Sequence, residues 1–96
     1  MPTYKPLPRF LRDYAALTPE QRLVLKRAVD RFVVDLERGR FRAGLCIKGV
    51  QGTPGVYELA WAPDGRATFE YGTPLHGEEP HIIWRRSGSH AVLSEP

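Results

Sequence analysis

The sequence predicts an α+β domain in which two N-terminal helices pack on a four-stranded, mainly antiparallel sheet. Apolar residues recur at helical intervals over residues 10–38, and a strong helix start, Thr18-Pro19-Glu20-Gln21, divides that stretch. From residue 43 onward the pattern changes to the alternation typical of strands, interrupted by turns rich in glycine and proline. Because the helices precede the strands in the chain, we expect them together on one face of the sheet.

The length and composition favour a single domain spanning residues 1–96. The 42% hydrophobic content is sufficient for a core, and the net charge of +3 is compatible with a nucleic-acid partner. One cysteine excludes an intramolecular disulfide framework and fits a reducing compartment. The chain shows no signal-peptide pattern and no apolar run of membrane-spanning length, so we expect a cytoplasmic protein with no membrane partner.

Prolines at positions 2, 6 and 8 predict an N-terminal extended arm or edge strand, because proline lacks the N–H that a central strand needs. Helical spacing predicts a short helix over residues 10–17. In the second helix, Thr18 is expected to cap the first turn, Pro19 to occupy the first helical position and Gln21 to close a capping box. Gly39 is expected to end it.

Four strands are predicted at residues 43–50, 56–62, 66–71 and 80–86. The tripeptide Pro63-Asp64-Gly65 suits a three-residue hairpin loop, which would pair residue 62 with 66, 60 with 68 and 58 with 70. That register segregates the side chains by face. The apolar face holds Tyr57, Leu59, Trp61, Ala67, Phe69 and Tyr71, and the other face holds Glu58, Ala60, Arg66, Thr68 and Glu70.

The neighbouring strands are expected to add Lys48, His81 and Arg85 to this polar face, with His90 just past the end of the last strand. Guanidinium groups bind phosphate through bidentate hydrogen bonds, and imidazole can move a proton near neutral pH. The pattern therefore favours a phosphate-binding site that is exposed to solvent and could cleave RNA. The alternative is an ordinary solvated sheet face with cross-strand ion pairs, followed by a solvated tail. The cysteine and histidines lack metal-ligand spacing, so no metal ion or other cofactor is expected.

Several short motifs in a fixed order resemble the RelE/ParE superfamily of bacterial toxins from type II toxin–antitoxin pairs. They are Lys48-Gly49-Val50, the Gly-x-Tyr strand opening at residues 55–57, the Gly-Arg strand at residues 65–71, and Ile-Trp-Arg-x-x-Gly-x-His at residues 83–90. The resemblance covers most of the chain and implies a RelE-like fold. It also implies a cognate antitoxin, which in this family commonly lays a folding segment across the helices and sheet edge. The proline-bearing arm is one expected docking place.

The resemblance further implies a ribosome-dependent mRNA endonuclease, with the ribosome and mRNA as partners. RNA phosphate would be bound by Lys48, Arg66, Arg85 and Arg86. The catalytic set implied by the family is Lys48, Glu58, Arg66, Arg85 and His90. In that set Glu58 or Lys48 would be the general base and His90 the acid, because the chain lacks the C-terminal tyrosine of some relatives. Two alternatives remain open: a non-enzymatic toxin that inhibits DNA gyrase, as in the ParE branch, and a non-catalytic RNA-binding domain.

Overall fold

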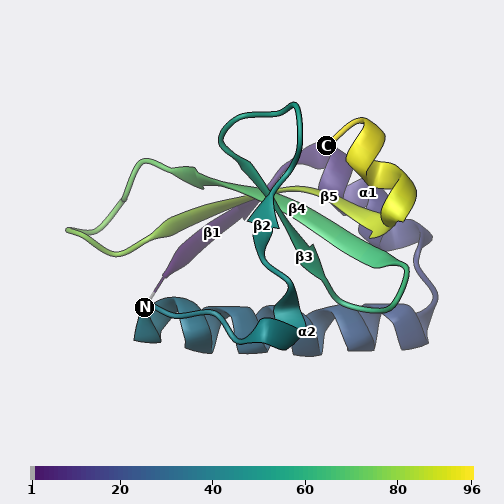
Figure 1. The fold of residues 1–96 in the computed structure, drawn as a ribbon, viewed down its shortest axis with the longest axis horizontal. Helices are drawn as coiled ribbons and strands as arrows, with labels where there is room; N and C mark the ends of the chain where they lie inside the picture. The colour runs from purple at the N-terminus through teal and green to yellow at the C-terminus, as the bar shows by residue number, and fades with distance from the viewer. Residues whose placement is uncertain (1) are drawn as a thin grey trace.

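A computed structural model describes residues 2–96 and confirms the α+β class (Figure 1). The sheet has five strands in the order β1-β5-β4-β3-β2, and all neighbouring pairs are antiparallel except β1 with β5. The predicted N-terminal edge strand accounts for the fifth. The strands are β1 (Thr3–Pro6), β2 (Lys48–Gly49), β3 (Val56–Ala60), β4 (Gly65–Gly72) and β5 (His81–Ser89). The helices are α1 (Pro8–Ala16) and α2 (Pro19–Arg38), with 3₁₀ helices η1 (Ala43–Leu45) and η2 (His90–Ser94).

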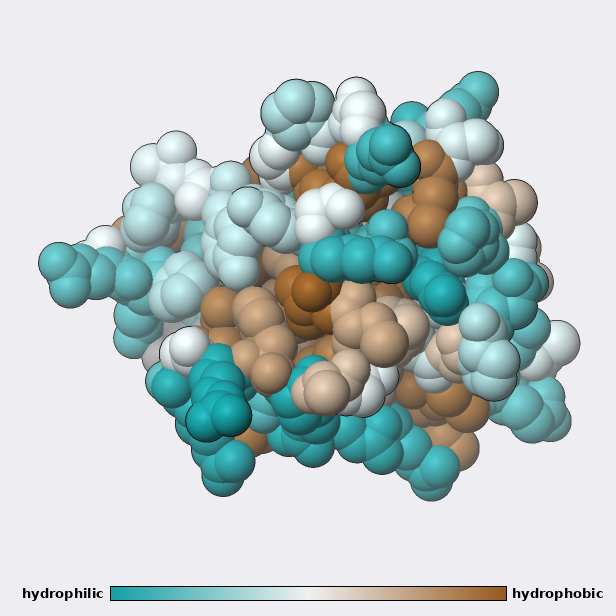
Figure 2. Space-filling view, viewed as in Figure 1, coloured by the Kyte–Doolittle hydropathy of each residue, from teal (hydrophilic) through white to brown (hydrophobic). Residues whose placement is uncertain are grey.

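The ends of α2 follow the predicted signals. Thr18 Oγ1 accepts a hydrogen bond from the Gln21 N–H, and the Gln21 side chain accepts one from the Thr18 N–H, which completes the capping box. Gly39 ends the helix in the left-handed conformation, with φ of 75°. In Figure 1, α2 lies along one side of the sheet and the yellow η2 lies on the other. The lower edge of Figure 2, which follows α2, is largely hydrophilic, with apolar residues gathered above it.

The core lies between α2 and the sheet and is centred on Phe32, which is completely buried. Its ring meets Phe69 at 4.9 Å and Trp84 at 5.2 Å between centroids, both edge to face, and stacks on Phe41 at 5.2 Å. Leu59 and Ala67 are also fully buried, as the predicted apolar face requires. Tyr71, at the far end of that face, is 47% exposed, although its ring meets those of Tyr57 and Phe69 edge to face.

A buried carboxylate fixes the chain where it leaves α2. Asp35 accepts hydrogen bonds from the Arg42 backbone N–H at 2.9 Å and from its guanidinium at 2.8 Å through both carboxylate oxygens. These hydrogen bonds lower the pKa of Asp35 to about 2. The contact orients the segment that runs from α2 to η1.

The predicted strand at residues 43–50 is largely wrong. Residues 43–45 form η1, and only Lys48 and Gly49 pair with β3. Cys46 lies between them with φ of 49°, a left-handed conformation that interrupts an extended strand. The alternation of Leu45 and Ile47 imitated a strand, because one tight turn also delivers Leu45 to the core.

The hairpin register is also corrected. Residue 60 pairs with 66, 58 with 68 and 56 with 70, so the loop between β3 and β4 is two residues longer than predicted. The Arg66 guanidinium stabilises this wider loop by donating from Nη1 to the carbonyls of Ala62, Pro63 and Gly65 at 2.9–3.2 Å. Because the shift is an even number of residues, every side chain keeps its predicted face.

The last strand extends beyond its predicted end at residue 86 to Ser89, with a bulge opposite Thr68 and Phe69. Phe69 pairs with Trp84 and Thr68 with Arg86, so Arg85 is the extra residue. No helix within residues 2–96 combines the length and the apolar character needed to cross a membrane.

Candidate functional site

Three of the predicted site residues form a cluster across β2, β3 and β4, which we call the Glu58 cluster: Lys48, Glu58 and Arg66. The Glu58 Oε1 atom lies 3.7 Å from Arg66 Nε and 4.0 Å from Lys48 Nζ. The Glu58 side chain is only 8% exposed and that of Arg66 19%, whereas Lys48 is 71% exposed. A nearly buried carboxylate is therefore held between two cations, one of which reaches into solvent.

Arg66 is held rigidly within this cluster. Its Nη1 atom bonds the loop carbonyls, and its Nε atom faces Glu58. Strand pairing places the backbones of the cluster: Lys48 pairs with residue 58, and Arg66 pairs with residue 60. A site whose charges are fixed before a ligand arrives needs little reorganisation during a reaction.

The bulge in β5 places two consecutive arginines where both can bond across the polar face. Arg85 donates from Nη1 to Glu70 Oε2 at 2.8 Å, a pair in which both side chains are about one-third exposed. Arg86 instead forms a two-pronged contact with Asp13 of α1, at 2.8 and 3.1 Å. Most of the guanidinium of Arg86 is thus engaged in joining α1 to the sheet.

Asp13 also completes the free edge of β5. The parallel pairing with β1 ends at Trp84, and Asp13 Oδ2 accepts the N–H of Ser87 at 3.1 Å. Burial alone would raise the pKa of Asp13, but the hydrogen bonds from Arg86 and Ser87 and the positive charges of Arg86 and Arg9 outweigh it and lower the pKa. No sequence pattern pointed to Asp13 or Arg9, because Asp13 contacts β5 and Arg9 contacts Glu95 from more than seventy residues away in the chain.

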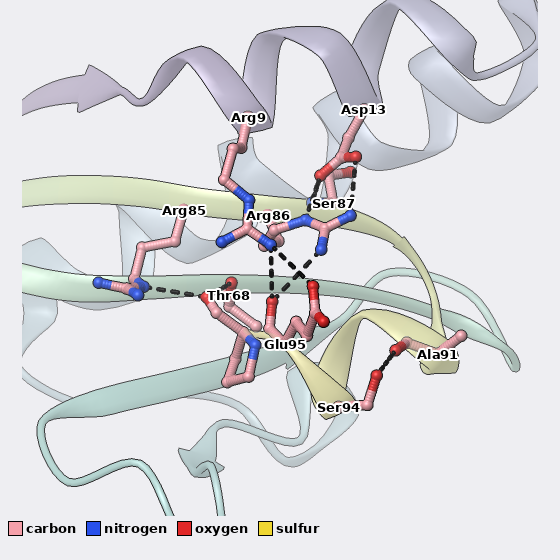
Figure 3. Close-up of polar contacts among 10 residues, drawn as sticks. Arg9, Asp13, Thr68, Arg85, Arg86, Ser87, Ala91, Ser94 and Glu95 are labelled. Atoms are coloured by element: carbon pink, nitrogen blue, oxygen red, sulfur yellow. Dashed lines mark hydrogen bonds and ion pairs between the residues drawn. The ribbon is translucent and has the colours of Figure 1, made fainter.

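The expectation that the whole polar face is open to solvent is wrong. Residues 90–96 fold back over the β4–β5 half of this face, and Thr68 beneath them is completely buried. The main-chain oxygen of Pro96 accepts hydrogen bonds from Arg85 Nε at 3.0 Å and Thr68 Oγ1 at 3.3 Å. The oxygen of Glu95 accepts from Arg86 and from Arg9, each at 3.3 Å (Figure 3). We call these four donors the tail-covered cluster: Arg9, Thr68, Arg85 and Arg86.

His90 begins η2 directly after Ser89, and its side chain is exposed. Ser89 pairs with Gly65 and residue 88 with Arg66, so His90 lies at the end of the sheet where β4 starts. The other histidine expected on the polar face, His81, is buried and shares a 2.7 Å hydrogen bond with Thr3. Within residues 2–96, no three His, Cys, Asp or Glu side chains gather closely enough to hold a metal ion.

Comparisons with known proteins decide what fold this is. No protein-family model matches the sequence, and no curated protein matches it. Solved structures do. The YoeB/ParE toxin from Agrobacterium tumefaciens superposes with a TM-score of 0.68 at 11% identity, covering 92% of this chain and 98% of that one. The chain has the RelE/ParE toxin fold.

Two toxin–antitoxin complexes extend this RelE/ParE match. A chain of the RelB–RelE antitoxin–toxin complex from Methanococcus jannaschii aligns with a TM-score of 0.61 at 17% identity, covering 94% of each chain. The Escherichia coli DinJ–YafQ complex gives a TM-score of 0.62 at 16% identity, covering 97% of this chain and 98% of the other. The fold implied by the sequence motifs is thus confirmed over nearly the full length.

Proposed function

We propose that this chain is the toxin of a type II toxin–antitoxin pair and that it cleaves ribosome-bound mRNA without a metal ion. The observation that carries the proposal is the Glu58 carboxylate, held between Lys48 and Arg66 on the polar face of a RelE-like sheet. A carboxylate buried only for stability is normally satisfied by close, direct hydrogen bonds. Here both cations stand 3.7–4.0 Å away, and one is largely exposed.

The chemistry needs a base, a cationic environment and an acid. Glu58, or Lys48 as the alternative, takes the proton from the RNA 2′-hydroxyl, whose oxygen then attacks the adjacent phosphorus. Arg66 and Arg85 stabilise the negative charge that develops on the phosphate oxygens. His90 gives a proton to the 5′-oxygen as its bond to phosphorus breaks, which leaves a 2′,3′-cyclic phosphate. Each proton transfer contributes about 10²–10⁴ in rate.

An antitoxin partner is part of the proposal, since the similar structures include toxins solved with their antitoxins. A groove of about 740 Å³ between α1, α2 and β1 is suited to an apolar helix. Its walls include Tyr4 and Leu11, which are 69% and 54% exposed. Strand addition at β1 is less favourable. Thr3 and Leu7 donate their N–H groups to the carbonyls of Pro80 and Trp84, and prolines at 2 and 6 leave only Tyr4 in this segment to donate outward.

The test is a reconstituted translation reaction in which mRNA 5′ ends are mapped by primer extension, with and without ribosomes. The proposal predicts new ends that require ribosomes and that disappear with His90→Ala protein of unchanged thermal stability. An intact message with folded, antitoxin-free protein would contradict it, and topoisomerase inhibition would then be measured to test a ParE-like activity.

A further inference from the structure

The C-terminal residues cover a part of the polar face where three arginine side chains lie. We propose that Arg9, Thr68, Arg85 and Arg86 form a phosphate-binding site for the RNA backbone, and that residues 95 and 96 close it with their own main-chain oxygens. RNA must therefore displace this segment. The inference rests on the proposed function for the identity of the ligand, but the site can be tested without cleavage.

The geometry resembles that of a bound phosphate. Four donors from α1, β4 and β5 converge on two oxygen atoms of adjacent residues (Figure 3). Phosphate also presents several closely spaced acceptor oxygens to arginine side chains. Three of the four hydrogen bonds are 3.3 Å long, at or beyond the usual limit for strong bonds, so the oxygens of residues 95 and 96 fill the site loosely.

The charge balance favours exchange of the segment for an anion. Among the side chains here, three guanidiniums meet three carboxylates: Arg9, Arg85 and Arg86 against Asp13, Glu70 and Glu95. Two of those carboxylates belong to α1 and β4 and stay in place. Moving residue 95 away leaves three positive charges against two negative ones. One phosphodiester, which carries a single negative charge, restores the balance.

The segment is anchored at its start by η2, which contacts β4 and β5, and its end is held by four hydrogen bonds and one ion pair. Val92 is the buried side chain of η2 and packs over Gly88. The Glu95 side chain is 79% exposed, and its ion pair with Arg9 spans 3.6 Å. Thr68, in contrast, is an entirely buried hydroxyl whose acceptor is the Pro96 oxygen, so opening the segment exposes a free donor for a ligand.

The test measures binding of a fluorescein-labelled 2′-O-methyl RNA hexamer, which cannot be cut through its 2′-oxygen, by anisotropy at low salt. The intact chain is compared with a chain that ends at Ser94. Removing residues 95 and 96 should tighten binding about three- to tenfold, since the competent open state is then always populated. Adding Arg9→Ala to the shortened chain should reverse the gain, whereas Arg12→Ala, on the same helix, should not.

Unchanged or weaker binding by the folded, shortened chain would overturn the inference. A second measurement on the intact chain covers the case in which shortening disturbs folding. Saturating RNA should move the backbone amide resonances of Ser94 and Glu95 to positions typical of an unstructured chain. If those resonances stay in place while RNA is bound, the inference fails. Absence of cleavage on the ribosome, with this binding behaviour intact, would count against the nuclease alone.

Discussion

The two halves of the polar face carry similar residues but are built differently. The Glu58 cluster comes from three strands that are adjacent in the sheet, and Lys48 at its edge is open to solvent. The tail-covered cluster joins α1, β4 and β5 and is closed by residues 95 and 96. We propose that the first half supplies the general base, Glu58, and that the second half binds phosphate and controls its access.

The largest expected effect distinguishes the two carboxylates of the polar face. Glu58→Gln should reduce single-turnover cleavage of ribosome-bound mRNA about 10²–10⁴-fold, because the amide cannot take the 2′-hydroxyl proton. Glu70→Gln is the matched control. Glu70 pairs with Arg85 and takes no proton in the proposed reaction, so this substitution should reduce cleavage less than tenfold. Equal losses for the two variants would remove the distinction between the halves.

A second prediction concerns what holds the tail-covered half together. Asp13→Ala should lower the free energy of unfolding by about 2–3 kcal/mol, because it leaves Arg86 and the Ser87 N–H without their carboxylate. Asp30→Ala, at an exposed position on α2, should change it by less than about 0.5 kcal/mol. Urea denaturation of both variants gives the comparison. A stability loss no larger than that of the control would show that α1 docks independently of Asp13.

Substitutions at two glycines test how tightly the core and the C-terminal segment are packed. A Cβ atom on Gly65 would lie 2.6 Å from the Trp61 ring, which is packed in the core, so Gly65→Ala should cost about 1–3 kcal/mol. A Cβ on Gly88 would meet only Val92 Cγ1, at 3.1 Å. Gly88→Ala should therefore cost less stability and instead loosen residues 90–96. Thermal unfolding measures the stability loss, and amide exchange of residues 90–96 measures the loosening. A larger stability loss at Gly88 than at Gly65 would contradict the view that residues 90–96 pack loosely on the sheet.

The pH dependence of stability should come from two aspartates. The folded-state pKa values of Asp13 and Asp35 lie below the ordinary 3.8, so each carboxylate contributes stability that is complete above that value. The contribution of Asp35 is lost as the pH falls from about 4 towards 2. Asp35→Asn and Asp13→Asn should each flatten the decline in melting temperature over this range, whereas Asp64→Asn should not. An unchanged slope in both variants would contradict the assignment.

The sequence predicted what depends on local pattern. The capping box at Thr18 and the separation of faces in the β3–β4 hairpin both follow from neighbouring residues, and the faces survived an error in loop length because that error was even. The strand at residues 43–50 failed because the left-handed conformation of Cys46 has no signature in residue type. The sequence could not predict contacts between distant segments, because no periodicity encodes them. Two such contacts are Asp13 with Arg86 and Glu95 with Arg9.

The most direct test of the account maps mRNA ends on ribosomes with three proteins in parallel: the intact chain, Glu58→Gln, and the chain ending at Ser94. We expect cleavage by the first, its loss in the second and faster cleavage at low protein concentration by the third. Cleavage at equal rates by all three, with each protein folded, would contradict both the role of Glu58 and the closing of the phosphate site by residues 95 and 96.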